Sequence, residues 1–221
     1  MFRQAFIGVA ALAAILAGLI AFWSTAAEKH PVVYGRNNTV LFITDNHHGL
    51  SNVHVATSFA LLENHPDIEI HYASFPKLRT KIERVSKAGQ ARNAAAKPIQ
   101  WHTLPGLNYV DAVMRTLYHR TSATGDMTTN PGVRGIEKLV TIMDTAVAPW
   151  TPEEHYDLLM SMRNLIEEVN PNVVVTDPLV YASLEASRGL NRSTAMISPN
   201  DLPTILGPLQ PRGAVFWKYP A

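Results

Sequence analysis

The segment from Thr39 to Phe59, TVLFITDNHHGLSNVHVATSF, constrains the fold most, because a buried strand runs into a polar turn and then into a helix. Residues 40–43 are aliphatic or aromatic, as in a strand that helices cover on both faces. Apolar residues then recur at three- and four-residue intervals, which predicts a helix over residues 52–63. Ser51 or Asn52 can cap that helix.

The turn between this strand and helix is the first candidate site. In α/β sheets, ligands bind beyond the carboxyl ends of the strands, and this turn follows such an end. It holds one glycine and no dinucleotide or P-loop fingerprint, which disfavours NAD, FAD and ATP sites. Its imidazoles are suited to accepting a proton near neutral pH. The polar residues of the turn are Asp45, Asn46, His47 and His48.

The rest of the chain alternates strands and helices. A Thr-Pro-Glu-Glu sequence at residues 151–154 is a strong helix start, with a capping Thr and early acidic residues. The alternation predicts one doubly wound α/β domain with a mostly parallel, Rossmann-like sheet. Strands are expected at residues 39–44, 68–74, 99–104, 173–176 and 194–198, and further helices at 76–87, 108–120, 133–147, 152–169 and 179–188.

The amino terminus predicts entry into the secretory membrane system. Residues 5–23 are apolar without exception, which is long enough to span a bilayer, and small residues after them fit a cleavage site. We therefore expect a signal anchor or a signal peptide over residues 1–27, a linker over 28–38 and one domain over 39–221. The protein would lie in the endoplasmic reticulum or secretory-pathway membrane, or be secreted after cleavage.

Charge and cysteine content narrow the function classes. The net charge is +1, so no nucleic acid partner is expected, and the basic stretch from Lys77 to Lys87 is interpreted as a solvated helix face. There is no cysteine, which excludes a thiol nucleophile and disulfides. His47 and His54 are too far apart along the chain to share a metal ion readily, so no metal site is expected.

A second candidate is Asp177, which directly follows the apolar strand ending VVVT. A carboxylate at that position can orient an imidazole and stabilise it once protonated. The alternative is that Asp177 only caps the next helix, with Pro178 at its first position. Likewise, His47 and His48 could be plain surface residues. Ser183 and Ser187 lack the nucleophile-elbow pattern, so a serine hydrolase is not supported.

These two turns together resemble the acceptor-binding amino-terminal half of UDP-dependent glycosyltransferases, which have two facing Rossmann-like domains (the GT-B fold). The resemblance covers residues 40–211 and is carried by VLFITDNHHGLSNVHVATSFALL and PNVVVTDPLVYASLEASRGL. Aligned on the strand, His48 falls at the position of the family's catalytic base; aligned on the glycine, Leu50 does. The resemblance implies His48 as the base, His47 as the next candidate and Asp177 as the supporting acid.

The same resemblance implies transfer of a hexosyl group from a UDP-sugar, used as co-substrate with no tightly bound cofactor. Little of the sequence follows Asp177, so the donor domain is expected to be missing or on a separate partner, and the chain to be inactive alone. The alternatives are a non-enzymatic, membrane-anchored binding module and a different Rossmann-like enzyme such as an isomerase. A lipidic or aromatic alcohol is the expected acceptor, in a pocket lined by Val113, Met114, Leu117, Met127, Met143 and Trp150.

Overall fold

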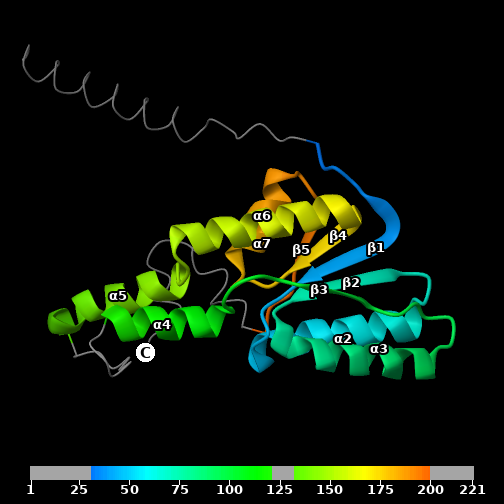
Figure 1. Cartoon of the computed structure of the whole chain (residues 1–221), viewed down its shortest axis with the longest axis horizontal. Helices are drawn as coiled ribbons and strands as arrows, with labels where there is room; N and C mark the ends of the chain where they lie inside the picture. The colour runs from blue at the N-terminus through cyan, green and yellow to red at the C-terminus, as the bar shows by residue number, and fades with distance from the viewer. Residues whose placement is uncertain (1–30, 121–131, 200–221) are drawn as a thin grey trace, which may run out of the picture. The chain divides into compact units, whose positions relative to one another are not determined.

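The computed structural model describes residues 31–120 and 132–199, which form a five-stranded parallel sheet with helices on both faces (Figure 1). The strand order is β3-β2-β1-β4-β5, so β1 lies at the centre between β2 and β4. All four neighbouring pairs are parallel. The α/β fold with a parallel sheet is therefore confirmed. The strands are β1 (Arg36–Ile43), β2 (Glu69–Ser74), β3 (Gln100–Thr103), β4 (Pro171–Thr176) and β5 (Thr194–Met196).

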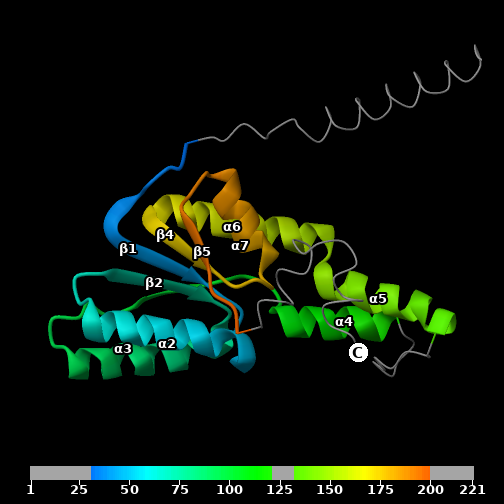
Figure 2. The ribbon, with the colours of Figure 1, turned by 180° about the vertical axis from the view of Figure 1, so that it is seen from behind.

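Helices cover the sheet in two layers, as the front and back views show (Figures 1 and 2). Alternate residues of β1 face opposite layers: Val40 and Phe42 pack with α2 and α3, whereas Leu41 and Ile43 pack with α4, α6 and α7. Both layers are apolar, which is why the strand sequences are continuous hydrophobic runs. The helices are α2 (His48–Asn64), α3 (Arg79–Arg92), α4 (Tyr109–Arg120), α5 (Ile136–Val147), α6 (Pro152–Val169) and α7 (Tyr181–Gly189), with short 3₁₀ turns at Pro76–Leu78 and Gly132–Gly135.

Helix α6 has the bounds expected from its sequence. The Thr151 hydroxyl accepts the Glu154 N–H, and the Glu154 carboxylate accepts the Thr151 N–H, which is the predicted capping box. At the other end, Asn170 adopts a left-handed conformation with φ of 50°, which asparagine tolerates better than most residues. That turn leads the chain directly into β4, so the carboxyl-terminal end of α6 is joined closely to the sheet.

Helices α2 and α3 differ most from the bounds predicted from the sequence. Helix α2 begins at His48, not at Asn52, with His47 as an N-cap whose side chain makes no capping hydrogen bond. His48 is thus the first helical residue and not part of the turn. Helix α3 continues to Arg92, beyond the end predicted at residue 87. Both differences arise because tertiary packing extends helices beyond their capping signals.

The amino-terminal segment predicted as an anchor or signal peptide, residues 1–27, lies outside the described residues. Within the part of the chain that the structure describes, no helix is both long and apolar enough to cross a membrane. The compact unit that contains the sheet begins at Val33, which forms a bridge with Arg192. Strand β1 starts at Arg36, so it takes up the last residues of the predicted linker.

Candidate functional site

Two buried acids lie where β1 and β4 end side by side. Ile43 and Thr176 are paired in the sheet, and the Asp177 N–H donates to the Ile43 carbonyl at 3.2 Å. Asp177 directly follows Thr176, Asp45 follows Ile43 after Thr44, and their exposed fractions are 1% and 0%. Because β1 and β4 pair in this register, the Asp45 and Asp177 side chains both lie at the edge of the sheet where the strands end. Sites in this fold are expected at that edge.

Asp45 ties the first turn to the start of α4. One carboxylate oxygen accepts the His47 N–H at 2.7 Å, and the other accepts the Tyr109 N–H at 2.8 Å. Burial raises the pKa of Asp45, whereas these two N–H groups and the charge of a protonated His47 ring oppose that rise. The charge of the His47 ring therefore influences the pKa of Asp45. The sequence alone indicates Asp177, and not Asp45, as the acid that would support a histidine.

Asp177 is held less completely. Its Oδ1 accepts the Leu179 N–H at 2.9 Å, and its Oδ2 has no hydrogen-bond partner among the described residues. Burial raises the pKa of Asp177 to about 6, the charge of Asp45 adds to that rise, and the N–H groups of Leu179 and Asp45 oppose it. The carboxyl group therefore changes its charge close to neutral pH.

Asp177 does not cap α7, which was the alternative reading of the sequence. Helix α7 begins at Tyr181, and its N-cap is Val180. Asp177 instead closes a local turn through the Leu179 N–H. Ser183 and Ser187 donate their hydroxyls to carbonyls of the same helical segment at 2.7 Å, so both are bonded within the helix. The Asp177 Oδ2 atom, at the end of β4, therefore has no structural hydrogen bond among the described residues and is available for another interaction.

His47 and His48 are both exposed at the amino-terminal end of α2. Among the described residues, neither imidazole makes a hydrogen bond to Asp177. The structure thus brings Asp45 and Asp177 together and places the two histidines on the rim above them. The catalytic roles of His47, His48 and Asp177 stay predictions.

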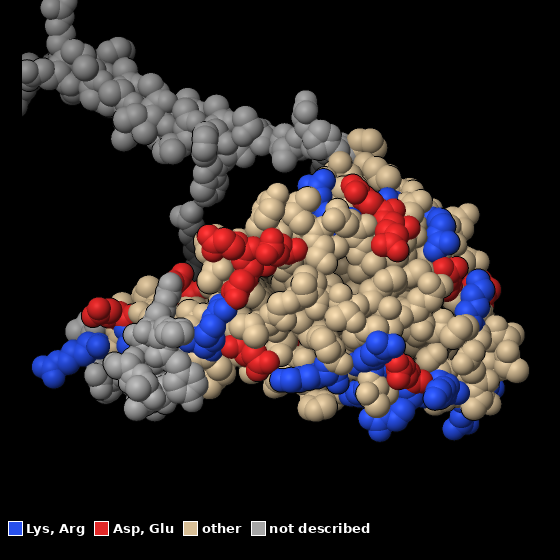
Figure 3. Space-filling view, viewed as in Figure 1, with Lys and Arg blue, Asp and Glu red and all other residues tan. Residues whose placement is uncertain are grey.

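The two histidines line a cleft of about 300 Å³ between the starts of α2, α3 and α4, here called the basic cleft. Basic side chains of the stretch 77–87 form the charged wall of this cleft. The sequence alone indicates a solvated helix face for that stretch. Figure 3 shows Lys and Arg side chains gathered over α3. The helix spacing places Lys77, Lys81 and Arg84 on one face of the segment. Opposite them, on α4, the cleft has one carboxylate, Asp111.

A second cleft, of about 280 Å³, lies between the starts of α6 and α7, and we call it the aromatic cleft. Its lining residues are Ala148, Trp150, Pro152, His155 and Tyr181. Trp150 is 8% exposed, donates its indole N–H to the Leu107 carbonyl at 2.9 Å and packs edge-on against Tyr109. His155 bonds Glu185 at 3.0 Å.

Tyr109 connects the two clefts with the buried acids. Its N–H bonds Asp45, its ring contacts Trp150, and its hydroxyl donates to the Ala146 carbonyl at 2.7 Å. Burial raises the pKa of Tyr109, and the nearby charges of Tyr181, Asp45 and Asp177 add to the rise. Tyr109 therefore links Asp45 to Trp150 of the aromatic cleft, and its neighbour Asn108 lines the basic cleft.

Of the apolar residues expected to line an acceptor pocket, Trp150 lines the aromatic cleft. Leu117 is buried in the protein interior, and Val113 and Met114 are half-buried on α4. Met127 and the side chain of Met143 lie outside the described part. Within the ranges 31–120 and 132–199, no group of three His, Asp or Glu side chains is placed to hold a metal ion.

The chain is similar to a curated glycosyltransferase. The chain is 25% identical to glycosyltransferase sdnJ of Sordaria araneosa over 193 residues, which is 86% of this chain and 37% of the relative. The chain thus spans little more than a third of the length of the curated relative that it matches. No protein-family profile matches the sequence.

Solved structures with partial similarity include two glycosyltransferases. The glycotransferase of kitacinnamycin aligns with a TM-score of 0.41 and 14% identity, covering 77% of this chain and 34% of that chain. CalG4, the calicheamicin glycosyltransferase, aligns with a TM-score of 0.38 and 14% identity, covering 81% of this chain and 39% of that chain.

Proposed function

We propose that this chain is the acceptor-binding part of a glycosyltransferase that transfers a hexosyl group from a UDP-sugar to an acceptor hydroxyl. The observation that carries the proposal is the similarity to glycosyltransferase sdnJ over 86% of the chain. The site adds support, because exposed imidazoles border a cleft at the same carboxyl edge of a parallel sheet where two carboxyl groups are buried.

In the proposed reaction, His48 acts as the general base. It removes the proton of the acceptor hydroxyl as the acceptor oxygen attacks the anomeric carbon, and the bond from that carbon to UDP breaks, so UDP leaves with the electron pair. The ring nitrogen that accepts the proton becomes positively charged. Asp177, with its free Oδ2, is the proposed acid that offsets this charge, and His47 is the second candidate base.

The aromatic cleft is the proposed place for the body of the acceptor. Trp150 and Tyr181 present ring surfaces there, and Tyr109 joins the cleft to Asp45. Aromatic walls with a few polar groups are typical of small-molecule sites. A lipidic or aromatic alcohol would place its ring system there and its hydroxyl toward the histidines. The acceptor class is therefore defined by one apolar body and one hydroxyl.

We further propose that the UDP-sugar binds mainly to polypeptide beyond these 221 residues, in the same protein or in a partner. The fraction of the relative that this chain spans supports that division. Membrane anchoring through residues 1–27 and residence in the secretory pathway belong to the same proposal, since an apolar acceptor would be concentrated at a membrane.

A domain exchange tests the proposal. This chain would replace the matching part of glycosyltransferase sdnJ, and release of UDP from UDP-glucose would be followed with a panel of phenols and sterols. We expect transfer by the chimera and none by the 221-residue chain alone. A cooperatively folded chimera that transfers nothing from any UDP-sugar would contradict the proposal and favour the non-enzymatic binding module.

A further inference from the structure

The basic cleft carries more positive charge than the structure neutralises. Lys77, Lys81 and Arg84 face it from the α3 segment, and Asp111 is its single carboxylate. Lys77 pairs with Asp111 at 3.2 Å, but 74% of the Lys77 side chain and 47% of the Asp111 side chain are exposed. Such exposed pairs contribute little and are easily rearranged. The charge of the cleft is therefore available to a ligand.

The other two cations have no acidic partner among the described residues. Lys81 donates to the neutral Asn52 amide oxygen. Arg84 donates from Nε to the Thr80 carbonyl of its own helix at 3.4 Å, which leaves the outer guanidinium nitrogens without a described acceptor. A guanidinium fork beside an ammonium is suited to binding a carboxylate or a phosphate.

An unpaired donor also lies behind the cleft wall. Asn46 lines the cleft, and its Nδ2 is buried without a hydrogen-bond partner among the described residues. A buried N–H donor without a partner costs free energy, so such donors are normally paired with protein, water or ligand. The buried Nδ2 of Asn46 does not face the open cleft, so Lys81 and Arg84 are the donors that the cleft offers, and an anion is the ligand that accepts from both.

We propose that the basic cleft binds a negatively charged group on the acceptor, so that the natural acceptor is an acid, a carboxylate or a phosphate or sulfate ester, that also carries the reacting hydroxyl. The anion site stands on the contacts above, whereas its assignment to the acceptor rests on the proposed transfer reaction. His48 lines the same cleft, so a hydroxyl within reach of that imidazole shares the cleft with the bound anion.

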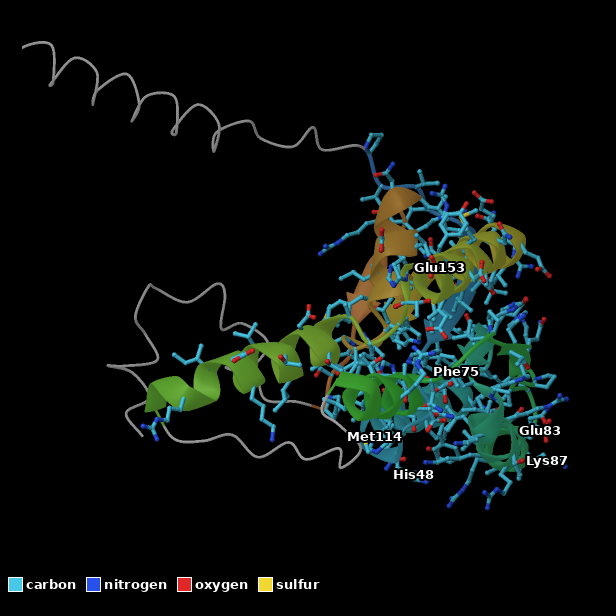
Figure 4. The ribbon with its side chains drawn as sticks, turned by 60° about the vertical axis from the view of Figure 1, so that its left-hand side comes forward. His48, Phe75, Glu83, Lys87, Met114 and Glu153 are labelled. Atoms are coloured by element: carbon cyan, nitrogen blue, oxygen red, sulfur yellow. The ribbon has the colours of Figure 1, made fainter. Side chains whose placement is uncertain are left out.

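Helix α3 carries a second pair of basic residues that can serve as a control for the loss of positive charge. Lys87 and Arg92 lie farther along α3, are exposed and do not line the cleft. Figure 4 shows Lys87 far from His48. The variants K81Q/R84Q and K87Q/R92Q remove the same net charge, but only the first pair removes donors from the cleft. Long-range electrostatic effects are therefore equal to a first approximation.

Binding to the full 221-residue chain would be measured by isothermal titration calorimetry with 2-naphthoate, its neutral analogue 2-naphthamide, and UDP. We expect 2-naphthoate to bind at least about tenfold more tightly than 2-naphthamide. K81Q/R84Q should weaken 2-naphthoate binding by about tenfold or more and leave 2-naphthamide binding unchanged, and UDP should bind only weakly to either chain, because its main site is proposed to lie outside these residues. K87Q/R92Q should behave as the unchanged chain does.

Three results would overturn the inference. Equal binding of the acid and the amide would show that the cleft does not select a charge. An equal loss in the two charge-matched variants would show a field effect and no site. Loss of UDP binding alone in K81Q/R84Q would assign the cations to the donor diphosphate. These readouts do not use sugar transfer, so an inactive chimera with normal 2-naphthoate selectivity would contradict the proposed function alone.

Discussion

The aromatic cleft and the basic cleft share one edge of the sheet but are built from different parts of the fold. Trp150 lines the aromatic cleft and also belongs to the apolar core formed by β1, β4, α6 and α7. In contrast, Lys77 and Arg84 in the basic cleft are exposed. Changes in the aromatic cleft should therefore alter stability, whereas changes in the basic cleft should alter ligand binding with little effect on stability.

The largest expected effect on stability is that of Trp150→Ala. The substitution removes a nearly buried indole, its hydrogen bond to Leu107 and its contact with Tyr109, so we expect a loss of about 3–5 kcal/mol in the free energy of unfolding. Urea denaturation would measure it. Tyr156→Ala is the control, since Tyr156 lies on α6 but is 60% exposed and should lose far less. Similar losses in both variants would remove the structural distinction between the clefts.

Replacing Asp177 should change the free energy of unfolding by about 2–3 kcal/mol, and the size of this change should depend on pH. The pKa of Asp177 is about 6 in the folded chain and about 3.8 without burial, so the folded state loses stability as pH rises from about 4 to about 6. Asp177→Asn does not ionise, and its Oδ1 still accepts the Leu179 N–H. We expect the variant to match the unchanged chain near pH 4 and to exceed it by about 2–3 kcal/mol at pH 7.

Denaturation with urea at several pH values would check this prediction. The quantity to follow is the difference in unfolding free energy between Asp177→Asn and the unchanged chain, because groups that do not interact with Asp177 titrate equally in both. A difference that is the same at pH 4 and pH 7 would show that Asp177 has an ordinary pKa. It would also remove the argument that this carboxyl group is held in a perturbed state beside Asp45.

The sequence was informative where local signals decide the structure. The apolar run before Asp45 predicted the central strand, and the Thr151 capping box predicted the bounds of α6. It was less informative where distant segments meet. The start of α2 at His48 has no capping side chain to mark it, and Lys81 and Arg84 become a cleft wall only because the starts of three helices converge. The contact of Asp45 with the Tyr109 N–H likewise joins residues that no local pattern connects.

Thr151→Ala tests the support of the aromatic cleft at a smaller scale. It removes the hydroxyl that caps α6 beside Pro152 and should lower the free energy of unfolding by about 1 kcal/mol. Thr141→Ala is the matched control, since its exposed hydroxyl bonds the Glu137 carbonyl inside α5 and alanine favours a helix. Thermal unfolding of both variants would measure the difference. Equal melting temperatures would show that the cap does not support the cleft.

The smallest expected change in stability is that of K81Q/R84Q. Surface substitutions of this kind change the free energy of unfolding by about 0.5 kcal/mol or less each. Urea denaturation would therefore show nearly the same midpoint for this variant and the unchanged chain. A loss as large as that of Trp150→Ala would mean that the basic cleft supports the fold, and it would cancel the contrast between the two clefts.

The central claim is that an imidazole of the basic cleft removes the acceptor proton, and a pair of histidine variants tests it most directly. His48 borders the basic cleft and His155 the aromatic cleft, so His48→Gln and His155→Gln make the same change at two places. In the chimera, we expect kcat for transfer from UDP-glucose to fall by about 10²- to 10⁴-fold in His48→Gln and to change little in His155→Gln. Unchanged kcat in His48→Gln, with or without His47→Gln added, would contradict the account.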